Sequence, residues 1–316
     1  MSVTLDADAA AIVRALQEAG RPALETLTPE EGRQQYLASR EVVNPEPPPL
    51  HSVTAIDIPG PAGPIPARLY RPLTLRQREG LAPALVYFHG GGWVIGDLDT
   101  HDVVCRTLAA GGETLVVSVD YRLAPEHKFP AAADDAIAAA TWIAGSARDL
   151  GIDPSRLVVG GDSAGGNLTA VTCLHAREAG LTFAGQVLIY PATDFAMSHP
   201  SHHDPDTYVI LTGPNIRWFR DHYLDRPEDA DHWKASPARV ASLAALPPAF
   251  VLTAGADPLH DEGHDFAERL KAAGVAVEYH TYPGQFHGFV TMGKVLPAAN
   301  DALEKISDWL KRLDQL

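Results

Sequence analysis

The sequence predicts an α/β protein built on a doubly wound, mostly parallel sheet. Short apolar runs typical of strands recur from residue 51 onward, separated mostly by enough chain for a helix. The later runs are apolar almost throughout, as in strands that helices cover on both faces. The chain has 316 residues, and open sheets can exceed the roughly 100 to 200 residues of a typical domain without splitting. We therefore expect one large core with a smaller appended piece.

The expected elements follow in chain order. Intervening helices are predicted at residues 131–144 and 165–179, and a third at 261–273 that ends at Gly274, a favourable helix terminator. The alternation of strands with helices is typical of a doubly wound sheet. The predicted strands fall at residues 53–58, 67–70, 84–88, 115–119, 157–160, 187–190, 250–253 and 275–282.

The N-terminal part precedes this alternation. Residues 1–40 read as two short helices, the second starting at Thr28, with a proline next and a glutamate at position 31. A proline-rich stretch then ends the helical pattern. We interpret 1–50 as cap helices and linker and 51–316 as the main domain. Residues 194–235 break the rhythm of that domain and are interpreted as an insertion that completes the cap.

Composition excludes several classes of protein. Hydrophobic residues make up 46% of the chain and charged residues 21%, as in ordinary globular proteins. There are 40 acidic side chains against 25 lysines and arginines, a net charge of -15 that repels nucleic acid. We expect neutral or weakly charged small ligands.

The expected location is a reducing cytoplasm. Cys105 and Cys173 form no CxxC pair and no disulfide-rich pattern. The N-terminus carries Asp6 and Asp8 where a secretory signal would be basic. No stretch approaches the roughly 20 apolar residues of a membrane span, so no membrane association is expected.

A candidate nucleophile lies in Gly161-Asp162-Ser163-Ala164-Gly165. This segment follows a predicted strand and precedes a predicted helix, the context that a nucleophile elbow requires. Glycines flank the serine because the tight turn leaves no room for β-carbons. Without that context the pattern could equally be a glycine-rich turn with an idle serine.

The segment His89-Gly90-Gly91-Gly92-Trp93 follows another predicted strand. Its backbone N–H groups, with that of Ala164, are expected to form an oxyanion hole. A phosphate-binding loop is excluded because no lysine followed by serine or threonine completes it. His89 is interpreted as a loop anchor, since this loop needs to supply only backbone donors.

A serine nucleophile needs a base and an acid, which in this kind of fold follow it in the order acid, then histidine. Asp257 follows the predicted strand 250–253, and His287 follows the last one. Asp261 and Glu262 are the alternative acids, but they begin a helix, where carboxylates favour the positive end of the dipole. We predict that Asp257 orients His287, which activates Ser163.

A cluster of histidines in the insertion raises the alternative of a metal site. His199, His202, His203 and Asp204 are possible zinc ligands. They lack a regular ligand spacing, and no other metal motif is present. We interpret them as part of a solvated loop and expect no metal.

Together the motifs resemble those of the hormone-sensitive-lipase-like family of α/β-hydrolases, a family of bacterial carboxylesterases. The resemblance covers about residues 50–312, and the aspartate before the serine is similar to one subgroup. It implies an α/β-hydrolase fold with a helical cap and hydrolysis of short to medium acyl esters through an acyl-enzyme, without a cofactor. It further implies oxyanion donors at Gly90, Gly91 and Ala164, and a bracing loop that contains Glu126. The segments that carry it are His89–Gly92, Tyr121–Glu126, Gly161–Asn167, Asp257–Leu259 and His287–Phe289.

Two other functions stay open at this point. A ligand-binding receptor on the same fold is one, although such proteins tend to lose the histidine that is present here as His287. An enzyme that cleaves an amide, lactone or carbamate is the other, because the acyl-transfer chemistry is shared. Long-chain lipase activity is disfavoured, since no large apolar lid helix is seen. The edge strand expected at 275–282 could pair with a second copy in a homodimer.

Overall fold

The computed structural model describes residues 4–76 and 80–313, and within them the strands form one eight-stranded sheet in the order β1-β2-β4-β3-β5-β6-β7-β8. The first two strands run antiparallel to their neighbours, and all later pairs are parallel. The predicted doubly wound, mostly parallel sheet is therefore confirmed. The strands are β1 (Ser52–Gly60), β2 (Gly63–Arg71), β3 (Ala82–Phe88), β4 (Leu115–Val119), β5 (Ile152–Asp162), β6 (Gly185–Ile189), β7 (Ala249–Ala256) and β8 (Val277–Phe286).

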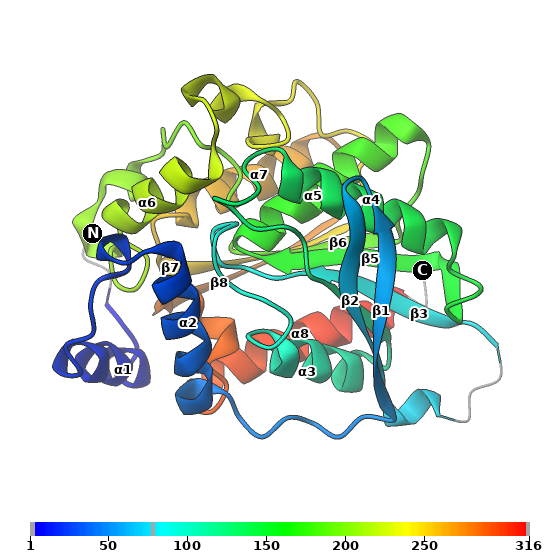
Figure 1. Ribbon diagram of the computed structural model, residues 1–316, viewed down its shortest axis with the longest axis horizontal. Coiled ribbons are helices and arrows are strands. Elements are labelled where there is room, and N and C mark those ends of the chain that lie inside the picture. The colour runs from blue at the N-terminus through cyan, green and yellow to red at the C-terminus, as the bar shows by residue number, and fades with distance from the viewer. Residues whose placement is uncertain (1–3, 77–79, 314–316) are drawn as a thin grey trace.

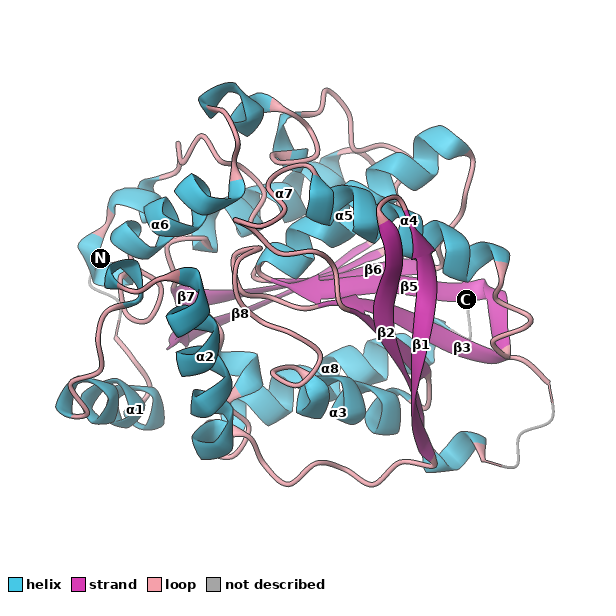
Figure 2. Ribbon diagram, viewed as in Figure 1, coloured by secondary structure: helices cyan, strands magenta, loops and turns pink. Residues whose placement is uncertain are grey.

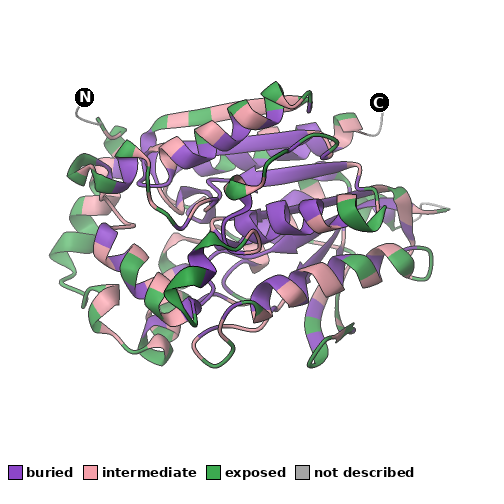
Figure 3. Ribbon diagram, turned by 90° about the horizontal axis from the view of Figure 1, so that it is seen from above, coloured by how far each residue is buried: buried purple, intermediate pink, exposed green. Residues whose placement is uncertain are grey.

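Helices cover both faces of this sheet, with α4, α5 and α7 on one side and α3 and α8 on the other (Figures 1 and 2). Strands β3, β4 and β6 are buried along their whole length. Figure 3 shows the buried strands between helices that expose their outer faces. The helices are α1 (Ala7–Glu18), α2 (Pro29–Val43), α3 (Asp102–Gly112), α4 (Ala131–Gly145), α5 (Ala164–Ala179), α6 (Gly213–Tyr223), α7 (His260–Ala272) and α8 (Pro297–Leu313).

The order of the strands creates a crevice at the carboxyl ends of β3 and β5. The chain leaves β3 toward β4 on one side and later returns to form β5 on the other side. Residue Phe88 at the end of β3 lies opposite Gly161 near the end of β5. The loops that follow these strands are therefore neighbours, and such a switch point is where open α/β sheets bind ligands.

The N-terminal helices form as the sequence predicts. Thr28 caps α2, because its hydroxyl accepts the Glu31 N–H at 3.3 Å while the Glu31 carboxylate accepts the Thr28 N–H at 2.9 Å. Such a reciprocal pair satisfies two backbone donors that the first turn leaves without partners.

The inserted segment contains a helix that the sequence pattern did not indicate. Helix α6 lies within 194–235 and contacts the N-terminal part (Figure 1). Asn215 donates to the Glu25 carboxylate at 2.6 Å, and the Trp218 indole donates to the Leu27 carbonyl at 3.2 Å. Two segments far apart in the sequence thus join above the carboxyl edge of the sheet.

Two further features bear on the expectations about partners. Strand β8 forms one edge of the sheet, and its pairing with a second copy stays a prediction. None of the helices in residues 4–76 and 80–313 combines the length and apolar character that crossing a bilayer needs.

The central position of β6 leads to a prediction about stability. Leu188 is fully buried, whereas Leu73 is 51% exposed. Leu188→Ala is expected to lower the free energy of unfolding by about 2 to 5 kcal/mol, because it removes buried methyl groups and leaves a cavity. Leu73→Ala is the matched control and should stay within about 0.5 kcal/mol of the original chain. Urea denaturation measures both, and equal losses would contradict the assignment of Leu188 to the core.

Candidate active site

Ser163 lies in the sharp turn between β5 and α5, as the sequence predicts. Its backbone has φ 56° and ψ -116°, a conformation that costs energy for a residue with a side chain. The turn is tight because β-carbons at Gly161 and Gly165 would lie only 2.3 Å and 1.9 Å from the Phe88 carbonyl oxygen. Only glycine fits at these two positions, and the packing holds the serine side chain above the sheet edge.

The structure brings Ser163, His287 and Asp257 together. Nε2 of His287 is 2.8 Å from Oγ of Ser163, and Nδ1 of His287 is 2.7 Å from a carboxylate oxygen of Asp257. An ionised carboxylate only accepts hydrogen bonds, so Nδ1 carries a hydrogen and Nε2 is free to accept the serine hydroxyl. This is the arrangement needed to remove a proton from the serine.

Asp257 rather than the two alternative acids reaches the histidine. It is fully buried after β7, and its other oxygen accepts the Leu259 N–H at 2.8 Å. Asp261 instead accepts the Ser201 N–H at 3.0 Å, and Glu262 lies 2.6 Å from Nε2 of His202. Both alternatives are engaged elsewhere.

The histidines of the insertion do not gather around a common point. Nε2 of His202 faces Glu262, and Nε2 of His203 donates to the Met197 carbonyl at 2.8 Å. Across the part of the chain that the structure describes, no three histidine, cysteine or acidic side chains are placed to hold a metal ion. Contrary to the expectation of a solvated loop, His202 is buried and joins the insertion to α7.

The expected oxyanion donor at Gly90 requires a correction. Its N–H donates to the Asp162 carboxylate at 2.9 Å and is therefore already used within the protein. Gly91 and Gly92 lie next along the chain and line the same cavity as Ser163. Their positive φ values of 118° and 58° are conformations that favour glycine. Sequence reasoning missed Gly92 because only the fold reveals which amides are engaged.

The amides of Gly91, Gly92 and Ala164 lie where a substrate oxygen could meet them. No acceptor contacts the first two amides among residues 4–76 and 80–313. Ala164 is the first residue of α5, and the first N–H groups of a helix have no partner within it. The positive end of the helix dipole adds to their attraction for a negative oxygen.

Asp162 holds the loop of residues 89–96, called the glycine loop below, in place. Besides the Gly90 N–H, its carboxylate accepts the Tyr87 hydroxyl at 2.7 Å and faces Nε2 of His101 at 3.4 Å. Burial raises the pKa of Asp162, but His101 and the Tyr87 hydroxyl favour the ionised form, and the net effect lowers that pKa. The aspartate before the serine thus connects the ends of β3 and β5.

His89 anchors the same loop and does not approach Ser163. Its ring stacks on the ring of Tyr121, with 4.4 Å between the two ring centres. The Tyr121 hydroxyl donates to the His89 carbonyl at 2.7 Å. Burial lowers the pKa of His89 to about 4, so the ring is neutral at neutral pH. This agrees with the predicted anchoring role.

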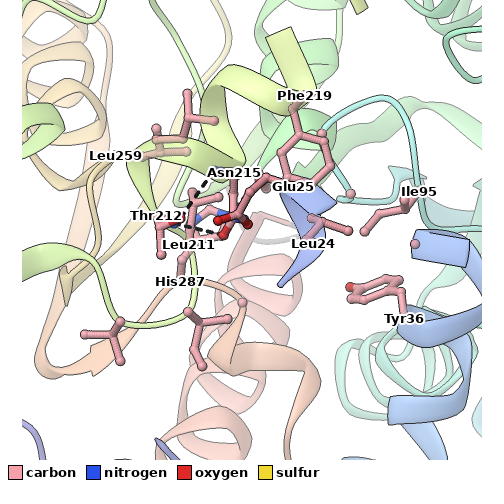
Figure 4. A pocket seen from close by; sticks show the side chains of 18 of the residues that line it. Leu24, Glu25, Tyr36, Ile95, Leu211, Thr212, Asn215, Phe219, Leu259 and His287 are labelled. Carbon is pink, nitrogen blue, oxygen red and sulfur yellow. Dashed lines mark hydrogen bonds between the residues drawn. The ribbon is translucent and has the colours of Figure 1, made fainter. Parts of the chain in front are cut away.

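A cavity of about 580 Å³ is lined in part by Ser163 and His287. Its volume falls within the range of small-molecule sites. The cap forms much of its wall, and Figure 4 shows apolar side chains around the space above His287. Representative apolar residues from α1, η1 (Leu24–Thr26), the glycine loop and α6 are Ile12, Val13, Leu24, Ile95, Ile216 and Phe219.

The loop of residues 121–126 ties the cap to the glycine loop. Arg33 of α2 contacts the Glu126 carboxylate at 2.8 Å and 2.7 Å and also donates to the Val94 and Ala124 carbonyls. The hydrogen bond from Arg33 lowers the pKa of Glu126 to about 2. Glu126 therefore braces the site through the cap, and does not contact the serine or histidine itself.

Comparison with known proteins identifies what this architecture is similar to. Residues 85–291 match the family model described as alpha/beta hydrolase fold. The carboxylic ester hydrolase LipN of Mycobacterium tuberculosis is 47% identical over 253 residues, which are 78% of this chain and 66% of LipN. An ethyl acetate hydrolase of Pseudomonas putida is 36% identical over 319 residues, covering 98% of this chain and 99% of that protein.

Solved structures of ester hydrolases are similar to this chain over almost its full length. The ester-hydrolase EH1AB1 from the metagenome of Lake Arreo superposes with a TM-score of 0.94 at 40% identity and covers 99% of this chain and 100% of its own. A hyperthermophilic esterase from Pyrobaculum calidifontis gives a TM-score of 0.89 at 42% identity, with 98% and 99% covered.

The ion pair between Arg33 and Glu126 leads to a prediction about pH. The pKa of Glu126 lies at about 2 in the folded chain, below its ordinary value of 4.5. Its contribution to stability is therefore fully present above about pH 4.5 and is lost as the pH falls toward 2. Glu126→Gln should lower the free energy of unfolding at neutral pH, modestly because the side chain is half exposed. Urea denaturation should show this difference shrinking as the solution is acidified below about pH 4.5.

The control for this prediction is Glu304→Gln, which changes an exposed carboxylate on α8. That variant should show no comparable dependence on pH. A difference between Glu126→Gln and the original chain that stays constant from about pH 7 to pH 3 would contradict the ion-pair account.

Proposed function

The chain belongs to the hormone-sensitive-lipase-like family of α/β hydrolases and is a carboxylic ester hydrolase, and we propose that Ser163, His287 and Asp257 are its catalytic triad. The observation that carries this proposal is the continuous pair of contacts from Asp257 through His287 to Ser163, at 2.7 Å and 2.8 Å. The substrates proposed are esters with short to medium acyl chains. No cofactor takes part in the proposed mechanism.

The first half of the reaction forms an acyl-enzyme. Oγ of Ser163 attacks the carbonyl carbon of the ester while Nε2 of His287 takes the hydroxyl proton. Asp257 stabilises the imidazolium that results, and its burial keeps water from competing for the Nδ1 hydrogen bond. His287 then returns the proton to the alcohol oxygen as the bond from the carbonyl carbon to that oxygen breaks.

The negative charge on the carbonyl oxygen requires hydrogen-bond donors. We assign this role to the N–H groups of Gly91, Gly92 and Ala164. Gly92 thus takes the place of Gly90, which the sequence led us to expect. Donors held rigidly before the reaction need no rearrangement during it, and losing one typically costs about 3 to 4 kcal/mol of barrier. The Asp162 contact with Gly90 supports the assignment, because it fixes the loop without using the next two amides.

The second half releases the acid. His287 takes a proton from water, the resulting hydroxide attacks the acyl carbon, and the ester bond to Ser163 breaks as the proton returns to Oγ. The same groups act in both halves because the second half is the first half in reverse, with water in place of the alcohol.

The scope of the substrate is argued from the cavity. Its volume of about 580 Å³ and its largely apolar walls suit an acyl chain of limited length. A Pseudomonas putida relative is named an ethyl acetate hydrolase, which supports short acyl groups here. Cleavage of amides or lactones is the competing proposal, since it uses the same triad.

Replacing the proposed nucleophile tests the mechanism. Ser163→Ala should leave a folded protein whose kcat for p-nitrophenyl butyrate is lower by about four orders of magnitude or more, because no covalent intermediate can form. Ser155→Ala, at an exposed serine near the opposite end of β5 from Ser163, is the control and should retain full activity. Hydrolysis by Ser163→Ala at the rate of the unsubstituted chain would contradict the assignment of Ser163 as the nucleophile.

A series of p-nitrophenyl esters tests the proposed chain length. Each buried CH₂ contributes about 0.8 kcal/mol, so kcat/KM should rise roughly threefold to fourfold per carbon while the acyl chain still fits. The proposal of short to medium acyl chains requires kcat/KM to fall again for dodecanoate and palmitate. The matching p-nitroanilide should react far more slowly than the ester. A maximum at palmitate, or faster cleavage of the anilide, would contradict the proposed substrate class.

A further inference from the structure

Arg40 is a charged side chain buried in the wall of the proposed substrate cavity. It lies in the last turn of α2 and is only 6% exposed. It lines the same cavity as Ser163 and His287. A cation in a largely apolar wall is costly unless a partner compensates its charge.

The contacts of Arg40 within the protein are all with neutral groups. Nη1 donates to the Thr291 hydroxyl at 2.5 Å, and Nε and Nη2 donate to the Ser39 hydroxyl at 3.2 Å and 2.9 Å. The guanidinium carbon lies 4.5 Å from the centre of the Tyr36 ring. In the ranges 4–76 and 80–313, no carboxylate forms an ion pair with it.

The acidic side chains of the cavity differ from Arg40 because each has a strong donor of its own. Among the described residues that line the cavity, these carboxylates are already paired or hydrogen-bonded, and Arg40 is the buried cation without an acidic partner for a negatively charged ligand to displace. The pairs are Glu25 with the Asn215 amide, Asp194 with Arg239, Glu262 with His202, and Asp162 with Tyr87 and the Gly90 N–H.

We infer that Arg40 binds a carboxylate carried by the ester substrate, an inference that rests on the proposed hydrolysis at Ser163 and narrows its substrates to anionic esters. A guanidinium has five N–H donors. Three hydrogen bonds to hydroxyls leave one N–H on each of Nη1 and Nη2. A carboxylate accepts two such parallel hydrogen bonds, and these charged contacts are stronger than those to neutral oxygens.

The position of Arg40 suits a ligand that also reaches the reacting groups. Its partner Thr291 belongs to η7 (Phe289–Thr291), which follows His287 almost directly. A substrate held at Arg40 by its carboxylate therefore extends along this loop toward Ser163. A substrate bound both at Arg40 and at Ser163 has its ester held in one orientation.

Matched pairs of substrates test the inference in both halves of the ester. Mono-p-nitrophenyl glutarate against p-nitrophenyl pentanoate places the carboxylate on the acyl side, because the two differ only by a carboxylate in place of a methyl group. 4-Acetoxybenzoate against 4-methylphenyl acetate places it on the alcohol side by the same exchange. For at least one pair, the ratio of kcat/KM for the anionic ester to that for the neutral ester should fall about tenfold or more in Arg40→Gln.

Two further variants separate recognition from a structural role. Arg40→Lys keeps the charge and should recover part of the lost ratio, although without paired contacts. Arg21→Gln removes an exposed charge from the same cavity and should change the ratio by less than about twofold, since exposed charges are screened. Equal losses for anionic and neutral esters in Arg40→Gln, or equal effects in the Arg21 and Arg40 variants, would overturn the inference.

A binding measurement covers the case in which the Arg40 variants do not fold. Benzoate should bind Ser163→Ala about tenfold more tightly than benzamide in calorimetry. Equal affinities would overturn the role of Arg40. Because this measurement needs no hydrolysis, it also separates the two proposals: an active Ser163→Ala defeats the proposed nucleophile, whereas equal affinities for benzoate and benzamide defeat the role of Arg40.

Discussion

The geometry of the site depends on the close approach of two strand ends, where the Phe88 carbonyl meets the turn around Ser163. The approach is possible only because Gly161 and Gly165 lack β-carbons. It forces the serine into a positive φ and directs the hydroxyl to the edge where His287 arrives from β8. It also brings the glycine loop after β3 beside the first turn of α5, so that nucleophile and oxyanion donors come from neighbouring strands.

Buried polar contacts keep these loops in register. Asp162 bonds the Gly90 amide and the Tyr87 hydroxyl, and the Tyr121 hydroxyl bonds the His89 carbonyl. Unmatched polar groups at such depth are costly, so each contact discourages loop positions that would break it. The fixed positions matter chemically because donors that must reorganise during the reaction stabilise the developing charge less.

The sequence predicts the frame of this arrangement well and its details less well. Strand runs are apolar enough to be recognised, and the motifs around Ser163 and His287 can be located because each follows a strand. The sequence pattern does not lead to a prediction of helices α3, α6 and α8. For α8, the regular spacing of its apolar residues is nevertheless a signal of a helix. The expectation that Gly90 is an oxyanion donor fails because spacing along a loop does not reveal that Asp162, 72 residues away, accepts its N–H. That contact exists only once β3 and β5 lie side by side.

The cap is the part that the sequence predicts least, and it forms much of the wall of the proposed substrate cavity. It is assembled from the N-terminal helices and the insertion around α6, which meet through contacts such as the Trp218 indole on the Leu27 carbonyl. Pairings between distant segments leave no periodic pattern, so neither the cavity nor the isolation of Arg40 from carboxylates can be read from spacing. The acyl-transfer groups all come from loops at the sheet edge, whereas Arg40 comes from the cap. Exchanging cap residues can therefore alter which ester binds while leaving the reacting atoms in place, and at position 40 such an exchange would remove a buried charge from the cavity wall.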